Sequence, residues 1–356
     1  MSANIKVVVV DDSAFMRKAI STMLKKHPEI DVVGIARNGQ EGLDLVRKLN
    51  PDVVTMDIEM PVMDGLTALK HIMMEMPRPV IMVSSLTTEG AESTLKAMEY
   101  GAVDFIPKQL SKVSLDIVKI EGELQSKVKA VARKKARTSR LAALQRPKKV
   151  PKQVKTTPAV LTGKLVRDIV VIGVSTGGPP VVQKILSELP ENFPGSILIA
   201  QHMPGAFTGP FARRLNDSTK MNVMEARDGE VIKPGWAYIA QGGKHLKIDQ
   251  KVSRIDIMVS EEPTDSLYKP SANVLFSSVA KGVGRRAVGV MLTGMGNDGL
   301  LGARDLKAKG GMLLAQSEET CVVYGMPKAV VDDGLVDQVV DLESMAEVIN
   351  ASLYEG

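Results

Sequence analysis

The chain has 356 residues, 44% of them hydrophobic, and a formal net charge of +5. This length is enough for about two domains, each with its own core. The longest apolar runs have the length of a strand, which excludes a membrane-spanning helix and predicts no insertion into a membrane. The N-terminal segment does not resemble a secretion signal, and Cys321 is the only cysteine, which excludes an internal disulfide. We therefore expect a cytoplasmic protein.

The positive charge is concentrated in one segment. Residues 125–156 contain twelve of the 46 Lys and Arg residues and no Asp or Glu, so the remaining 34 basic residues are fewer than the 41 acidic ones. The segment also has no aromatic residue that could stack on a base. These features predict a solvated basic linker and no nucleic-acid partner.

The first part of the chain alternates between apolar strands and amphipathic helices. The predicted strands cover residues 5–10, 31–36, 53–56, 80–83 and 103–106, and the predicted helices cover 14–26, 39–48, 66–74 and 91–100. This alternation predicts an open parallel sheet, with functional groups at the carboxyl ends of its strands.

Polar side chains follow four of these strands. Asp11 and Asp12 come after the first strand and Asp57 after the third, so three carboxylates are expected at one edge of the sheet. Crowded carboxylates repel one another unless a hard cation joins them, which predicts Mg²⁺. Ser84 and Lys108 follow the fourth and fifth strands, where they could bind the oxygens of a phosphoryl group transferred to a carboxylate. The alternative is that these aspartates only cap helices.

The order and spacing of these residues resemble the receiver domains of bacterial two-component response regulators, from residue 1 to about residue 110. The resemblance implies individual roles: Asp57 as phosphoacceptor, Asp11 and Asp12 as metal ligands with the backbone carbonyl of Glu59, and Phe105 as the switch aromatic. The chain departs from the family in one place, because the usual Lys-Pro order is reversed in Pro107-Lys108.

The second half of the chain begins with a strand at 169–172 that runs into Gly173-Val174-Ser175-Thr176-Gly177-Gly178. A helical pattern with two prolines at its start follows. A G-x-S-x-G match between a strand and a helix is typical of a nucleophilic serine on a sharp turn. The alternative is a glycine turn that cradles a phosphate or packs a helix on a strand. A nucleotide site is weakly supported, since neither G-x-G-x-x-G nor a Gly-Lys-Ser/Thr ending is present.

A nucleophilic serine needs a base, and two of the four histidines lie in the first half of the chain. His202 follows a strand predicted at 196–200, at the same edge as Ser175, whereas His245 lies in a hairpin-like region. Topology therefore favours His202 over His245. Asp298 lies in a glycine-rich loop after the strand 287–292 and could orient the imidazole, cap the next helix, or do both.

Two glycine loops provide candidate oxyanion donors, the backbone N–H groups of Thr176 and Met295. The order Ser175, His202, Asp298 differs from that of the α/β-hydrolases, which predicts a different fold with similar chemistry.

Together with the receiver and the basic segment, three motifs resemble the CheB-type chemotaxis methylesterases. The motifs are residues 173–178, Gln201-His202-Met203-Pro204 and residues 292–299. The resemblance implies hydrolysis of glutamyl γ-methyl esters and deamidation of glutamines on methyl-accepting chemotaxis receptors. It also implies a chemotaxis histidine kinase as phosphodonor, with Mg²⁺ needed in the receiver and no cofactor needed for the esterase reaction.

The sequence thus predicts an α/β protein with two doubly wound parallel-sheet domains. We place the receiver at 1–124, a flexible basic linker at 125–160 and the catalytic domain at 161–356, and we expect phosphorylation of Asp57 to relieve inhibition of the catalytic domain. The alternative is a response regulator whose second half binds DNA. Against it, no helix-turn-helix pattern is evident, and the chain outside the linker is not basic.

Overall fold

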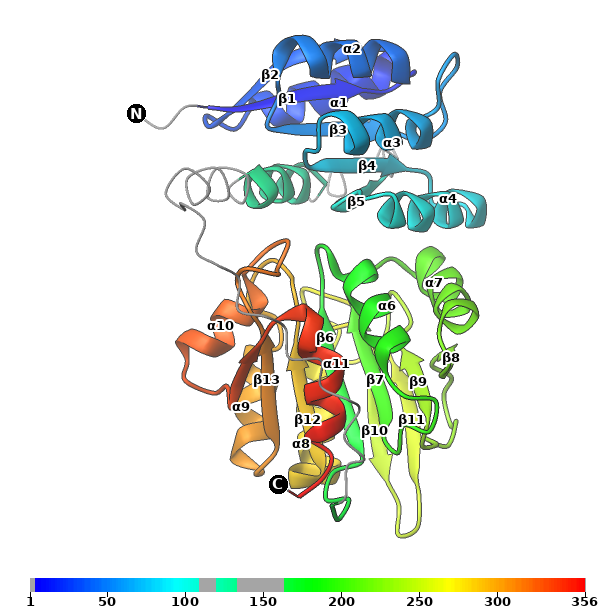
Figure 1. Ribbon diagram of the computed structural model, residues 1–356, viewed down its shortest axis with the longest axis vertical. Helices are drawn as coiled ribbons and strands as arrows, with labels where there is room; N and C mark the ends of the chain where they lie inside the picture. Colours follow the sequence, from blue (N-terminus) through cyan, green and yellow to red (C-terminus); the bar gives the residue numbers. More distant parts are fainter. Residues whose placement is uncertain (1–3, 109–119, 133–162, 356) are drawn as a thin grey trace, which may run out of the picture. The chain divides into compact units, whose positions relative to one another are not determined.

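The computed structural model describes residues 4–108, 120–132 and 163–355. The chain forms two units, Met1–Leu141 and Ala142–Gly356 (Figure 1). Among the described residues, no helix is both long enough and apolar enough to cross a membrane.

The first unit contains a five-stranded sheet in the order β2-β1-β3-β4-β5, and all of its strands are parallel. Its elements are β1 (Ile5–Val10), α1 (Ala14–Lys25), β2 (Ile30–Ala36), α2 (Gly39–Leu49), β3 (Val53–Asp57), α3 (Gly65–Glu75), β4 (Val80–Ser84), α4 (Thr88–Glu99) and β5 (Asp104–Pro107). All the elements predicted here are present, with ends that differ by three residues or fewer.

Side-chain caps define where the helices of the first unit begin. A side-chain oxygen accepts a hydrogen bond from a backbone N–H of the first turn in each of α1 to α4, and the capping residues are Ser13, Asn38, Asp64 and Thr87. Such caps pair N–H groups that have no partner within the helix. The caps place the first turns of α1 and α3 directly after the loops that follow β1 and β3.

Residues 120–132 form a helix that packs on the first unit. Leu124 and Val128 are buried, and the Gln125 side chain donates a 2.6 Å hydrogen bond to the carbonyl of Met23 in α1. The predicted start of the linker, residue 125, is therefore too early in the chain, because residues 125–132 belong to this packed helix. The rest of the predicted linker, 133–160, lies outside the described residues.

The second unit contains a seven-stranded parallel sheet in the order β14-β13-β12-β6-β7-β9-β8 and a separate antiparallel hairpin, β10-β11. Its strands are β6 (Ile169–Val174), β7 (Ser196–Gln201), β8 (Asn222–Glu225), β9 (Trp236–Ile239), β10 (His245–Gln250), β11 (Ile255–Ser260), β12 (Ala287–Met291), β13 (Met312–Gln316) and β14 (Gln338–Val340). Its helices are α6 (Gly178–Glu188), α7 (Gly205–Ser218), α8 (Ala272–Val283), the short 3₁₀ helix η1 (Gly284–Arg286), α9 (Leu300–Ala308), α10 (Met326–Asp332) and α11 (Leu342–Ala351).

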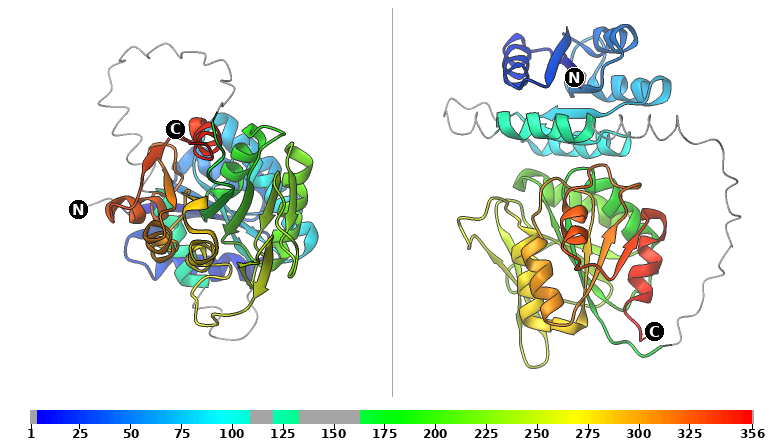
Figure 2. Two further views of the ribbon diagram at one scale, coloured as in Figure 1. Left: turned by 90° about the horizontal axis from the view of Figure 1, so that it is seen from below. Right: turned by 90° about the vertical axis from the view of Figure 1, so that its left-hand side faces the viewer.

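Helices cover both faces of this sheet. Figures 1 and 2 show α6 and α11 on one face and α8 and α9 on the other. Every residue of β6, β7 and β12 is buried, as expected for parallel strands covered on both sides. Because the chain runs outward from β6 to β7 and returns to β12 on the other side, the order reverses between β6 and β12. Ligands bind at such a reversal, outside the carboxyl ends of the strands.

Helices α8 and α9 approach each other closely. A Cβ atom at Gly302 of α9 would lie 2.6 Å from both the carbonyl oxygen of Asn273 and the Cβ of Phe276, so a side chain there would force the helices apart. Leu306, one turn further along α9, is fully buried in the core between this helix pair and the sheet. The contact between α8 and α9 therefore fixes where the first turn of α8 lies.

Two leucines of α9 provide a matched test of this core. Leu306→Ala should lower the free energy of unfolding by about 2–5 kcal/mol, because it leaves a cavity. Leu301→Ala should change it by less than about 0.5 kcal/mol, because Leu301 is 58% exposed. Urea unfolding followed by the fluorescence of Trp236, the only tryptophan, measures both. Equal losses for the two variants would contradict this packing.

Candidate active site

Ser175 lies on a tight turn between β6 and α6. Its backbone N–H donates to the carbonyl of Thr293 at 3.0 Å, and its own carbonyl accepts from the N–H of Gly178 at 2.9 Å. Gly177 has φ of +76°, and a Cβ there would lie 2.5 Å from Val322. Both facts require glycine at this position. The predicted strand, turn and helix are therefore present around Ser175.

His202 is the histidine next to Ser175. It follows β7, and its Nδ1 lies 3.1 Å from the Oγ of Ser175, while its Nε2 lies 2.7 Å from Oδ2 of Asp298. A carboxylate only accepts hydrogen bonds, so the ring hydrogen belongs on Nε2. This assignment leaves the lone pair of Nδ1 directed at the serine hydroxyl. The three predicted residues thus form one hydrogen-bonded chain, at the reversal of strand order between β6 and β12.

His245, the alternative base, is engaged elsewhere. Its Nε2 lies 3.2 Å from the carbonyl of Pro263, and its Nδ1 accepts from the N–H of Ser271 at 3.3 Å. Since both ring nitrogens have these partners, His202 is the better candidate.

Asp298 is buried against the N-terminus of α8. Its carboxylate accepts hydrogen bonds from the Ser271 hydroxyl at 2.8 Å and from the backbone N–H groups of Ala272 at 2.6 Å and Asn273 at 3.1 Å. Burial raises the pKa of Asp298, but the hydrogen bond and charge of His202, with the bonds from Asn273 and Ser271, outweigh burial and set the pKa below its ordinary value of 3.8. The carboxylate is therefore ionised and fixed in orientation.

One of the two roles suggested for Asp298 is not observed. The sequence suggested a cap for the helix that follows it, but α9 begins after Gly299 without any side-chain cap. Asp298 instead accepts from the first turn of α8, a helix that lies earlier in the chain. The sequence could not predict this pairing, because Asp298 and the first turn of α8 are about 25 residues apart and meet only through the close contact of α8 and α9.

The two predicted oxyanion loops meet beside Ser175. The hydroxyl of Thr293 donates to the carbonyl of Thr176 at 2.9 Å, and a Cβ at Gly294 would lie 2.9 Å from the Cβ of Ser175. The loop that contains Met295 thus packs directly on the nucleophile turn. The role of the Thr176 and Met295 N–H groups stays a prediction.

Two further residues contact His202, and the sequence predicted no role for either of them. The Tyr268 ring stacks on the His202 imidazole, with centroids 4.2 Å apart and an interplanar angle of 6°. The buried Gln201 side chain donates to the carbonyls of Ser175 at 3.0 Å and His202 at 3.2 Å. The contact of Gln201 could have been predicted, because Gln201 adjoins His202 in the sequence. The contact of Tyr268 could not, because Tyr268 lies in an irregular segment with no pattern that points to His202.

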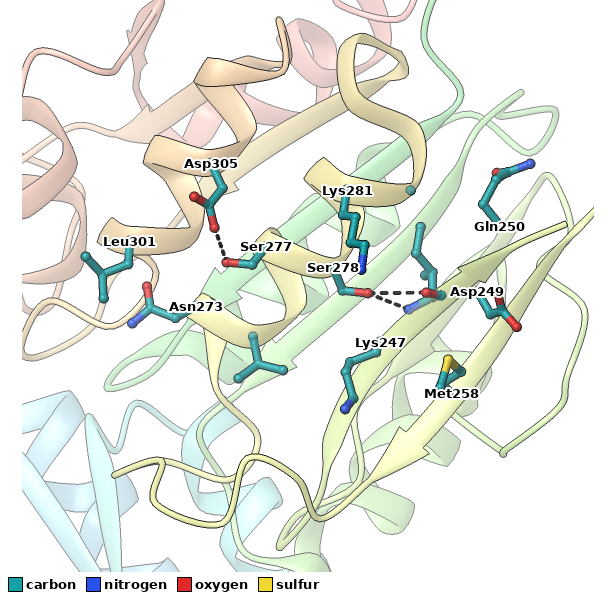
Figure 3. Close-up of a pocket in the computed structure, with 13 residues that line it drawn as sticks. Lys247, Asp249, Gln250, Met258, Asn273, Ser277, Ser278, Lys281, Leu301 and Asp305 are labelled. Carbon is teal, nitrogen blue, oxygen red and sulfur yellow. Dashed lines mark hydrogen bonds between the residues drawn. The ribbon is translucent and has the colours of Figure 1, made fainter.

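A groove of about 910 Å³ lies away from these residues, between the β10-β11 hairpin and helices α8 and α9 (Figure 3). It contains charges of both signs, from Lys247, Lys281, Asp249 and Asp305. None of the three residues of the hydrogen-bonded chain lines it. This groove is therefore separate from the candidate active site.

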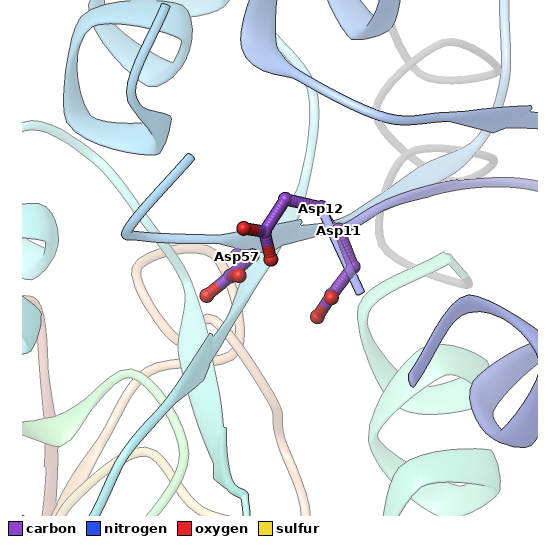
Figure 4. Close-up of side chains that lie close together, drawn as sticks. All are labelled: Asp11, Asp12 and Asp57. Carbon is purple, nitrogen blue, oxygen red and sulfur yellow. The ribbon is translucent and has the colours of Figure 1, made fainter. Parts of the chain in front are cut away.

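The acidic residues of the first unit gather as predicted (Figure 4). One oxygen from each of Asp11, Asp12 and Asp57 lies within 4.8 Å of the others. Lys108 Nζ lies 2.7 Å from Asp57 and 3.4 Å from Asp11, so the reversed Pro-Lys order still brings the lysine to these carboxylates. Burial raises the pKa of Asp57 to about 6, against the opposing hydrogen bond from Lys108. A set of carboxylate oxygens suits Mg²⁺, so these residues fit that ion.

The other predicted receiver residues are Ser84 on β4, Phe105 on β5 and Glu59 after β3. The buried Ser84 hydroxyl accepts from the Thr94 hydroxyl at 2.6 Å and lies 3.1 Å from the carbonyl of Gly90. Phe105 is buried, and its carbonyl accepts from the Lys127 amine at 2.8 Å. Glu59 lies in the loop after β3, and the role of its carbonyl stays a prediction.

The cap on α8 gives a prediction about stability. Asp298→Ala should lower the free energy of unfolding by about 1–3 kcal/mol, because three donors at the start of α8 lose their acceptor. Ser175→Ala should change it by less than about 1 kcal/mol, since Ser175 contributes one side-chain hydrogen bond. Unfolding monitored at Trp236 compares them. The cap would be refuted if Asp298→Ala were as stable as Ser175→Ala.

Comparisons with known proteins agree with this geometry. Residues 170–349 match the family described as CheB methylesterase, and residues 7–118 match the response regulator receiver domain. A protein-glutamate methylesterase/protein-glutamine glutaminase of Nitratidesulfovibrio vulgaris is 61% identical over 99% of this chain and 100% of its own length. A protein of the same name from Pyrococcus horikoshii is 44% identical over 98% of this chain and 94% of its own.

A solved structure supports the assignment of the second unit. The CheB methylesterase catalytic domain of Thermotoga maritima is 38% identical, with a TM-score of 0.51, and the match covers 52% of this chain and 97% of that one. The second half matches a methylesterase and not a DNA-binding domain. The chain therefore belongs to the CheB methylesterase family, in the form that carries an N-terminal response regulator receiver domain.

Proposed function

We propose that this chain hydrolyses glutamyl γ-methyl esters on methyl-accepting chemotaxis receptors through Ser175, His202 and Asp298. The observation that carries the proposal is the hydrogen-bonded chain from Ser175 Oγ through the imidazole to the ionised carboxylate. The names of the relatives, protein-glutamate methylesterase/protein-glutamine glutaminase, supply the substrate class. We propose chemoreceptors as the substrate proteins because the chain belongs to a family of chemotaxis methylesterases.

In the first half of the reaction, Ser175 Oγ attacks the ester carbonyl while His202 Nδ1 takes the hydroxyl proton. The backbone N–H groups of Thr176 and Met295 hold the negative oxygen of the tetrahedral intermediate. Asp298 stabilises the imidazolium that forms. The proton then passes from Nδ1 to the methoxy oxygen, the C–O bond breaks, and methanol leaves an acyl-enzyme on Ser175.

In the second half, His202 Nδ1 takes a proton from water, and the resulting hydroxide attacks the acyl carbon. Collapse of that intermediate breaks the bond to Ser175 Oγ, which takes the proton back from Nδ1, and frees a glutamyl carboxylic acid that loses its proton to solvent and becomes the receptor glutamate carboxylate. The same steps on a glutamine side chain release ammonia in place of methanol, which accounts for a deamidase activity at the same site.

We also propose that phosphorylation of Asp57 by a chemotaxis histidine kinase raises this activity. Asp11, Asp12, Asp57 and the carbonyl of Glu59 would hold Mg²⁺, which neutralises negative charge on the incoming phosphoryl group. Lys108 and Ser84 would bind the oxygens of the phosphoryl group once it is on Asp57, and Phe105 would respond as the switch aromatic. The esterase reaction itself uses the three side chains of the second unit and two backbone N–H groups.

Ser175→Ala should reduce methanol release from methylated receptor membranes by about 10⁴-fold or more, because the nucleophile is lost. Ser187→Ala is the matched control, since Ser187 is exposed on α6 and its hydroxyl donates to the carbonyl of Lys184. It should retain full activity. Wild-type turnover in purified Ser175→Ala would rule out the serine mechanism.

Asp57→Asn should keep basal methanol release but lose its stimulation by acetyl phosphate and Mg²⁺. Removal of Mg²⁺ with EDTA should have the same effect on the wild-type protein, because the cation is needed only for transfer to Asp57. Asp44→Asn, on the exposed side of α2, should remain fully responsive. Stimulation that persists in Asp57→Asn would show that the phosphoacceptor is a different residue.

A further inference from the structure

His245 is a fully buried titratable residue that the proposed reaction does not use. It begins β10 and pairs with Ser260 at the end of β11, so it lies at the base of the segment that connects the hairpin to α8. Its ring contacts both ends of that segment. Ser271 N–H donates to Nδ1 at 3.3 Å, and Nε2 lies 3.2 Å from the carbonyl of Pro263.

These two partners define the state of the ring. An N–H donor at Nδ1 requires a lone pair there, so the ring hydrogen sits on Nε2 and is donated to Pro263. Burial lowers the pKa of His245, and the nearby charges of Lys269 and Lys247 lower it further, against the opposing hydrogen bond from Pro263 and the charge of Asp298. The ring is therefore neutral, with one acceptor and one donor committed to the two ends of residues 263–271.

Residues 263–271 carry two side chains that contact the proposed catalytic groups. Tyr268 stacks its ring on the imidazole of His202, and the hydroxyl of Ser271 donates to Asp298 at 2.8 Å. The segment is also joined to the turn that precedes β10 by a 3.0 Å hydrogen bond from Gly243 N–H to the carbonyl of Lys269. Tyr268 and Ser271 both lie towards the end of the segment that His245 holds through Nδ1, so a shift at that end would move contacts on both His202 and Asp298.

We propose that His245 is a positioning residue for the esterase reaction, which acts by holding residues 263–271 against His202 and Asp298. Through Tyr268 it keeps the imidazole plane aligned with Ser175, and through Ser271 it keeps the carboxylate turned towards Nε2. This inference rests on the proposed function. Because proton transfer depends on alignment, a displacement of about 1 Å costs on the order of a hundredfold in rate.

Two substitutions separate the two hydrogen bonds of His245. In His245→Asn the side-chain oxygen takes the place of Nδ1 and can accept from Ser271, but the donor to Pro263 is lost. In His245→Gln the side-chain nitrogen takes the place of Nε2 and can donate to Pro263, but the acceptor for Ser271 is lost. His71→Gln, on α3 of the receiver, is the matched control for removal of a histidine.

The kinetic experiment measures kcat and KM for methanol release from methylated receptor membranes by the full chain. We expect His245→Gln to lower kcat about ten- to a hundredfold with KM changed less than about twofold, and His245→Asn to stay within about threefold of wild type. Equal losses in both variants, or wild-type kcat in His245→Gln, would overturn the proposal.

A spectroscopic experiment tests the same proposal without turnover. The stacked Tyr268 ring shifts the NMR signals of the His202 ring protons, and Tyr268→Leu gives their unstacked position. We expect His245→Gln to move these signals towards that position and His245→Asn to leave them near wild type. Four histidines in the chain make the assignment practical. Unmoved His202 signals in a folded His245→Gln would contradict the proposal.

The two experiments also separate failure of the inference from failure of the proposed function. If the wild-type protein releases no methanol, the proposed function has failed, and the NMR signals alone decide whether His245 holds the His202 ring. If His245→Gln does not fold, Tyr268→Leu decides, because Tyr268 lies on a surface segment. A fall in its kcat of about tenfold supports the proposal, and wild-type kcat overturns it.

Discussion

The carboxylate of Asp298 at the N-terminus of α8 is the interaction on which the proposed site depends. It accepts from Ser271, Ala272 and Asn273 on one side and from His202 on the other. These bonds keep it ionised and oriented although it is buried. The packing of α8 against α9 therefore fixes the carboxylate of Asp298. A fixed carboxylate in turn keeps the ring hydrogen of His202 on Nε2.

The sheet explains why three distant residues meet. Ser175, His202 and Asp298 each follow a parallel strand, and β12, β6 and β7 are neighbours in the sheet. Their carboxyl ends share one edge, at the point where the strand order reverses. The proposed nucleophile, base and carboxylate thus come together in a chain order unlike that of the α/β-hydrolases. In the receiver, Asp11, Asp57 and Lys108 likewise lie at the carboxyl ends of strands, in that unit's own sheet.

Much of this arrangement could be predicted from the sequence, because strand ends and glycine turns are local features. The turn at Ser175 and the place of His202 after β7 are both present in the structure. Contacts made by irregular segments could not be predicted: Tyr268 on His202 and the α8 cap by Asp298 depend on how distant elements pack. Residues 125–132 of the packed helix were assigned to the linker, because their basic side chains resemble a linker, whereas the buried face of the helix, which includes Leu124 and Val128, packs on the first unit.

The central claim is that Ser175, His202 and Asp298 act as one unit. The most direct test compares residual methanol release in Ser175→Ala, in His202→Gln and in the variant that combines them. Residues that act as a unit lose their function together, so the double variant should be no slower than the slower single variant. If the two losses multiplied in the double variant, serine and histidine would act independently, and the account of a linked nucleophile and base would be contradicted.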